Sequence, residues 1–152
     1  MKKKIFEVLF FLIIVPIAGY VLLHLTFLLD SLYQGLFFKN LFENPSEQYR
    51  WFVYFTQGSF ALMILLVSFV FMQSGIPDSI KAIFAPVPIG VLFITISIYF
   101  YKFPLITYTL CVICYCGSLF HLRKKGKTWI YYYSITLTGL IMLVLAIMGM
   151  DI

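Results

Sequence analysis

The fold is decided by the stretch IFEVLFFLIIVPIAGYVLLHLTFLL, residues 5–29. Apart from the acid Glu7 and the histidine His24, it consists of uncharged and mostly apolar residues. The hydrocarbon core of a bilayer is about 30 Å thick, and roughly 20 apolar helical residues cross it. The stretch is therefore long enough to span a membrane. Because its apolar part is long and no small-residue cleavage pattern precedes Asp30, we interpret it as a retained span and not as a cleaved signal peptide.

The whole chain has a composition typical of membrane proteins. Of its 152 residues, 62% are hydrophobic and 11% are charged, whereas soluble domains carry about 25% charged residues. A transmembrane β-barrel would alternate apolar and polar residues over segments of about 10, but runs such as residues 61–72 are apolar without alternation. We therefore predict an all-α integral membrane protein with a single membrane domain, residues 1–152.

Short polar breaks divide the apolar runs. Residues 31–43 place their apolar side chains on one helical face, which predicts a short amphipathic interfacial helix after the first span. The alternative is that this segment prolongs the first span. The sequence Asn-Pro-Ser-Glu at residues 44–47 is typical of a helix start. The breaks predict a bundle of five transmembrane helices, at residues 5–29, 48–73, 83–101, 104–122 and 129–150.

The shortest break is Lys102-Phe103-Pro104. A single helix through both flanking runs would have about 40 residues and a length of about 60 Å, twice the bilayer core. We therefore predict that the chain turns at residues 102–104.

Basic residues predict the orientation. With five spans, eight lysines and arginines lie on one side and three on the other. Positive residues stay on the cytoplasmic side, so we predict a multi-pass protein of the cell (cytoplasmic) membrane with its N-terminus inside and its C-terminus outside. The larger group is Lys2, Lys3, Lys4, Lys81, Arg123, Lys124, Lys125 and Lys127, and the smaller group is Lys39, Arg50 and Lys102.

The second basic cluster, Arg123, Lys124, Lys125 and Lys127, flanks an apolar run. This placement is typical of a topology signal, which we predict to be its main role, and it also suits anionic lipid headgroups. It does not suggest a nucleic-acid partner.

A polar layer in the outer leaflet is the best candidate ligand-binding site. His24 lies six residues before Asp30, and Gln57 lies six residues after Trp51, so both come about 9 Å below the outer surface. Tyr108 reaches a similar depth. We hypothesise that these side chains meet under a lid formed by residues 31–43, where they would bind a lipid headgroup or pass a proton. The alternative is that they are ordinary hydrogen-bonding contacts between helices.

Other residues suggest no catalytic, cofactor or metal site. Cys111 and Cys114 have the spacing of a redox pair, with Cys116 close by, but they lie in mid-span, where a thiolate is disfavoured. We interpret them as small packing residues. The only histidines, His24 and His121, fall on opposite sides of the predicted membrane, so we expect no shared metal and no haem. Known nucleotide-binding, metalloprotease and hydrolase motifs are absent from the sequence.

These observations predict a small, non-enzymatic membrane protein that acts through helix–helix or lipid contacts, as an accessory or immunity-type protein. Its partners would be the lipid bilayer and either another membrane protein or further copies of itself. One alternative is a subunit of a small oligomeric transporter or channel. A second is a lipid-modifying enzyme with His24 as its base and Asp30 as its partner, although residues six apart do not stack on a straight helix.

Overall fold

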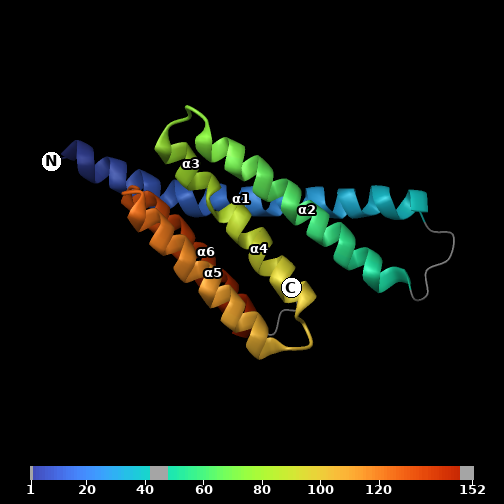
Figure 1. Ribbon diagram of the computed structural model, residues 1–152. Coiled ribbons are helices and arrows are strands. Elements are labelled where there is room, and N and C mark those ends of the chain that lie inside the picture. Colours follow the sequence, from blue (N-terminus) through green and yellow to red (C-terminus); the bar gives the residue numbers. More distant parts are fainter. Residues whose placement is uncertain (1, 42–47, 148–152) are drawn as a thin grey trace.

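The computed structural model describes the backbone of residues 2–41 and 48–147, and the side chains of residues 6, 8–36 and 51–144. All regular structure in these ranges is helical. Figure 1 shows the arrangement of the helices in space. The elements are α1 (Lys2–Leu41), α2 (Gln48–Gln73), α3 (Asp78–Phe84), α4 (Pro86–Tyr99), α5 (Pro104–Lys124) and α6 (Trp129–Ile147).

Four helical segments are long and apolar enough to cross a membrane. They confirm the prediction of a helical chain of the membrane type, by length and composition. The described apolar part of α6, Trp129–Val144, is shorter than these four, so the fifth span stays a prediction. The four segments are Val8–Leu36, Trp51–Gln73, Asp78–Tyr99, which combines α3 and α4, and Pro104–Lys124.

The helix α1 corrects the prediction for residues 31–43. Instead of a span followed by a separate interfacial helix, one continuous helix of 40 residues ends at Leu41, and residues 42 and 43 lie outside the described part. Such a helix is about 60 Å long, and it extends past the rest of the bundle in Figure 1. The physical reason is that Tyr33 and Gln34 hydrogen-bond to α2, to Ser59 and Gln57. These bonds hold the segment against protein.

The centre of the bundle is α4, which packs against α1, α2, α5 and α6. One of the close approaches is between Gly19 of α1 and the ring of Pro86, where a Cβ on the glycine would lie 3.5 Å from the ring. The centre of the bundle is therefore apolar and close-packed. The buried residues of α4 are Pro86, Val87, Ile89, Gly90, Val91, Phe93 and Ile94.

The predicted turn at residues 102–104 is confirmed, since α4 ends at Tyr99 and α5 begins at Pro104. Proline has no backbone N–H, so it cannot bond the carbonyl four residues before it. That carbonyl belongs to Phe100, and it accepts from the Phe103 N–H at 2.8 Å and from the Thr107 hydroxyl at 2.9 Å. These bonds close the turn and fix the start of α5.

One end of the bundle gathers three segments that are distant in the sequence. The start of α1, the connection between α2 and α3, and the connection between α5 and α6 lie together in Figure 1. A bond between Lys127 and Asp78 joins the last two of them. The α4–α5 turn and the C-terminal end of α1 lie toward the opposite end.

Candidate functional site

The structure joins two of the predicted site residues, Asp30 and Gln57, through a third that the sequence analysis missed. The Gln34 amide donates to Asp30 Oδ2 at 3.0 Å and to Gln57 Oε1 at 3.1 Å. The Gln57 side chain is buried between α1 and α2, with 3% of its surface exposed. The other carboxylate oxygen, Asp30 Oδ1, is buried and has no hydrogen-bond partner in the described part of the chain. We call Asp30, Gln34 and Gln57 the outer polar cluster, after the side of the membrane that the sequence predicts for it.

Further hydrogen bonds join the same helices, some between side chains and some to backbone carbonyls. The Tyr33 and Ser59 hydroxyls are 3.0 Å apart across the α1–α2 contact, and Ser59 also donates to the Thr56 carbonyl. The Tyr99 hydroxyl donates to the Tyr54 carbonyl at 2.6 Å, which connects α4 to α2. The polar residues of this region thus link three helices. Gln34 lies four residues after Asp30, so the two share one face of the helix. This spacing was a signal that the sequence analysis did not use.

His24 does not join the outer polar cluster. Its side chain is exposed, its Nδ1 lies 3.0 Å from the Tyr20 carbonyl oxygen, and its ring packs on the Tyr20 ring with centroids 4.0 Å apart. Six residues separate His24 from Asp30, which turns the two side chains about 120° apart around a helix. The predicted meeting of His24, Gln57 and Tyr108 is therefore not formed, and α1 forms no lid over it.

Tyr108 lies elsewhere, on a groove between α4, α5 and α6. The groove has a volume of about 590 Å³, and its lining is mostly apolar. Its floor includes the buried Phe93 and Ile94 of α4, while Val112 and Leu143 are exposed at its sides. The other lining residues come from the same three helices: Ser97, Thr107, Cys111, Tyr115, Thr136, Gly139, Leu140 and Met142.

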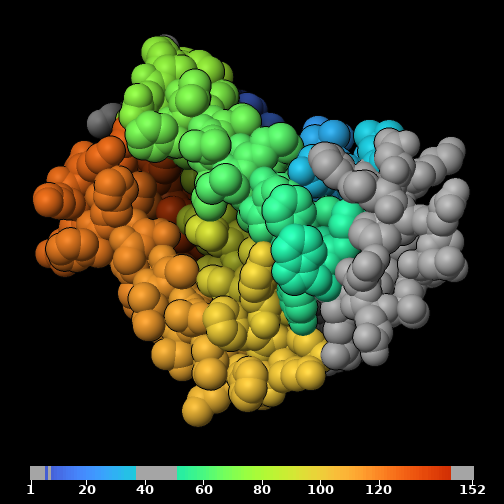
Figure 2. Space-filling model, turned by 45° about the vertical axis from the view of Figure 1, so that its right-hand side comes forward, coloured from blue at the N-terminus to red at the C-terminus, as the bar shows by residue number. Residues whose placement is uncertain are grey.

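The groove follows from the way in which α5 is packed. Only Thr107 and Leu122, near its two ends, are buried, and the turns between them pack against the core in part, through partly buried residues such as Cys111 and Tyr115. In the space-filling view α5 (orange) is separated from α2 (green) by α4 and by a hollow in which α6 (dark red) is visible (Figure 2). The sequence did not predict this groove, because an evenly apolar helix does not indicate which of its turns touch protein.

The cysteines are all free. Cys111 lines the groove and is half-buried, Cys114 is half-buried, and Cys116 is exposed. Within the described ranges, His, Cys, Asp and Glu form no group of three that would hold a metal ion. Cys111 and Cys114 pack against the core of the bundle.

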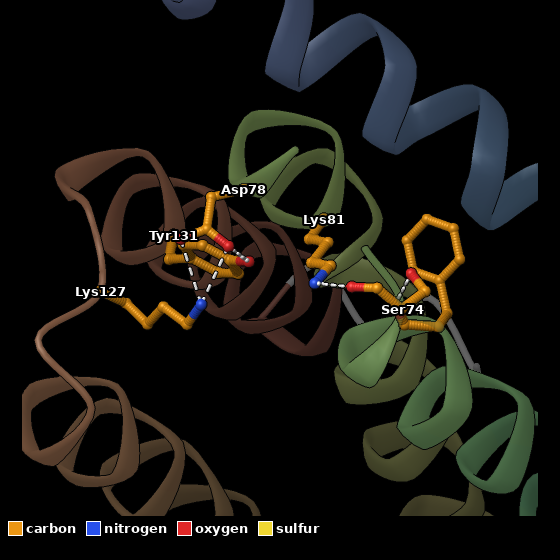
Figure 3. A network of polar contacts seen from close by, with 6 residues as sticks. Ser74, Asp78, Lys81, Lys127 and Tyr131 are labelled. Atoms are coloured by element: carbon orange, nitrogen blue, oxygen red, sulfur yellow. Dashed lines mark hydrogen bonds and ion pairs between the residues drawn. The ribbon is translucent and has the colours of Figure 1, made fainter. Parts of the chain in front are cut away.

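At the opposite end of the bundle lies a second polar group, Asp78, Lys127 and Tyr131, which Figure 3 shows from close by. The Lys127 ammonium donates to both Asp78 oxygens, at 2.9 and 3.1 Å, and lies 5.2 Å from the centre of the Tyr131 ring. The Tyr131 hydroxyl lies 3.4 Å from Asp78 Oδ1. Close by, the buried Lys81 donates to the Ser74 carbonyl. We call Asp78, Lys127 and Tyr131 the inner latch, after the side of the membrane that the basic residues predict for this end.

The predicted headgroup cluster thus divides into two parts. Arg123, Lys124 and Lys125 are exposed, whereas Lys127 forms the ion pair of the inner latch.

Comparison with known proteins finds no match to a protein-family model, to a curated protein or to a solved structure. The function is therefore inferred from the residues of this chain.

Proposed function

We propose that this chain is a non-enzymatic membrane protein of five spans, which acts as an accessory or immunity-type protein through contacts with another membrane protein or with lipids. In this arrangement α6 is the fifth span. The N-terminus lies in the cytoplasm and the C-terminus lies outside.

The observation that carries this proposal is the inner latch. It holds the start of α3 against the connection between α5 and α6, and the start of α1 lies at the same end of the bundle (Figure 1). These segments contain eight lysines and arginines, against three toward the opposite end. Such a bias favours the cytoplasmic side for the first end, and in the proposed arrangement α6 leads away from it.

The hydrogen bonds within and between the helices support a role based on contacts with other helices or with lipids. Side chains such as Thr26 and Ser68 donate to carbonyls four residues earlier in their own helices, and the outer polar cluster joins α1 to α2. The first pattern satisfies hydroxyl groups where lipid offers no hydrogen-bond partner, and the second joins neighbouring helices. The pair that a lipid-modifying enzyme would need is not formed, because Asp30 bonds to Gln34 and His24 lies on another face of α1.

Purification from native membranes tests the proposal. We expect that the tagged protein, extracted in a mild detergent after chemical crosslinking, is recovered in stoichiometric amounts with one partner membrane protein or with further copies of itself. An unrelated five-span protein with the same tag is the control. Recovery as a monomer that converts added phospholipid into a product would contradict the proposal.

A further inference from the structure

We propose that the groove between α4, α5 and α6 binds the acyl tail of one phospholipid of the outer leaflet, with the lipid phosphate at Lys102. This inference rests on the proposed five-span orientation and adds a ligand to it. Its first support is the chemistry of the groove. The lining is almost entirely apolar, and its exposed sides include Val112 and Leu140, so the groove is open to the surroundings of the bundle.

The size of the groove fits an acyl tail. An apolar cavity of about 150 Å³ holds one benzene, so the groove, with a volume of about 590 Å³, has room for a stretch of acyl tail. Along α5 the lining runs from Thr107 to Tyr115, which is about 12 Å at the rise of a helix. The hydrocarbon of one leaflet is half of a core about 30 Å thick. The groove is therefore about as deep as one leaflet, which matches one lipid tail more closely than a helix that spans both leaflets.

The inner end of the groove is closed. The Tyr115 hydroxyl donates to Thr136 Oγ1 at 3.1 Å, which joins α5 to α6. A Cβ on Gly139 would lie 3.1 Å from the Tyr115 ring, so the two helices approach closely at this level. Beyond it, the buried Leu122 fixes the end of α5. A tail that enters from the outer side thus ends near the middle of the bundle.

The outer end of the groove has a positive charge. Thr107 lines the groove and its hydroxyl bonds to the Phe100 carbonyl, so the turn that contains Lys102 lies directly at this end. The Lys102 side chain is exposed, with its ammonium 5.7 Å from the centre of the Tyr101 ring. Tyr108, also exposed, lines the groove next to Thr107 in the sequence. An ammonium and a phenol beside an apolar groove suit a lipid phosphate above its tail.

Native mass spectrometry of the purified protein tests the inference. Phosphatidylglycerol is added in increasing amounts to the delipidated protein, and phosphatidylcholine is the second probe. We expect one phosphatidylglycerol to bind. Cys111→Trp, which fills the groove, should lose most of the bound lipid. Cys116→Trp is the matched control, because it places the same ring on an exposed, non-lining position of α5.

A surface variant keeps the test decisive if Cys111→Trp does not fold. Lys102→Gln changes only an exposed side chain of the turn, and we expect it to bind phosphatidylglycerol about fivefold more weakly. Absence of bound lipid in the wild type, equal lipid binding by the two tryptophan variants, or a dimer that excludes lipid would each overturn the inference. If the protein stays in salt-washed membranes but binds no lipid, only this inference fails. If the salt wash releases the protein, the five-span proposal fails as well.

Discussion

The Tyr133 hydroxyl donates to the Leu12 carbonyl oxygen at 3.1 Å, from α6 to α1. Pro16 lies four residues after Leu12 in α1 and has no N–H to offer this carbonyl. The tyrosine therefore replaces the backbone bond that proline removes. In lipid, where no water is available, such a replacement allows a proline within a spanning helix.

This relationship predicts a coupling between Tyr133 and Pro16. Tyr133→Phe should lower the free energy of unfolding by about 1 kcal/mol, the usual size of a hydrogen bond between membrane helices. In a Pro16→Ala background the Leu12 carbonyl regains a helical amide, so the same change should cost less. Unfolding in mixed micelles measures both, with Tyr132→Phe as the control. Equal costs in the two backgrounds would show that the hydroxyl does not serve the proline.

The outer polar cluster predicts the effect of removing its donor. Gln34→Leu leaves both Asp30 Oδ2 and Gln57 Oε1 without the amide that bonds them. Leaving buried acceptors unpaired costs about 1–3 kcal/mol, so the unfolding free energy should fall by that amount. Adding Asp30→Asn should recover part of the loss, because a neutral amide is less costly to bury than a carboxylate. The prediction fails if Gln34→Leu unfolds like the wild type.

Gly58 allows α2 and α4 to approach. A Cβ at this position would lie 2.5 Å from the Tyr99 hydroxyl oxygen, which bonds to the Tyr54 carbonyl. Gly58→Ala should therefore displace Tyr99 and lower the thermal midpoint. Gly117→Ala on α5 is the control, since a Cβ there meets nothing within 4 Å and alanine favours helix by about 1 kcal/mol. Equal midpoints for the two variants would contradict the close approach at Gly58.

The inner latch should contribute little to stability. The side chains of Lys127 and Asp78 are 27% and 45% exposed, and exposed ion pairs contribute about 0.2–1 kcal/mol. Lys127→Glu should lower the unfolding free energy by about 1 kcal/mol or less at low salt, and by less at high salt because the charges are screened. The exchanged pair, Lys127→Asp with Asp78→Lys, should restore it. An effect independent of salt would rule out an ion pair as its cause.

Along α1 the sequence predicts the secondary structure but not the packing. Its apolar length predicted a helix, but the amphipathic pattern of residues 31–43 did not indicate whether that face meets lipid or protein. The answer depends on Ser59 and Gln57, more than 20 residues away. By contrast, the described part of α2, Gln48–Gln73, has the bounds predicted for the second span, and the predicted start signal at residues 44–47 lies outside the described residues.

The candidate site was predicted in part. Depth below the membrane surface indicated His24, Gln57 and Tyr108, but depth alone does not determine which side of a helix a residue faces. His24 and Tyr108 have the expected positions along the chain and face elsewhere. Likewise, charge predicted the end of the bundle at which Lys127 lies, while its bond to Asp78 depends on the packing of α3 against α6.

Accessibility of single cysteines in intact cells tests the central claim most directly. In a background with Cys111, Cys114 and Cys116 replaced by alanine, one cysteine is placed at Lys102 or at Lys125, and a tag is placed at each end of the chain. With five spans, a membrane-impermeant thiol reagent labels position 102 in intact cells and position 125 only after the membrane is opened, and only the C-terminal tag is accessible from outside. Labelling of both positions from the same side, or exposure of both tags on one side, would contradict the five-span arrangement.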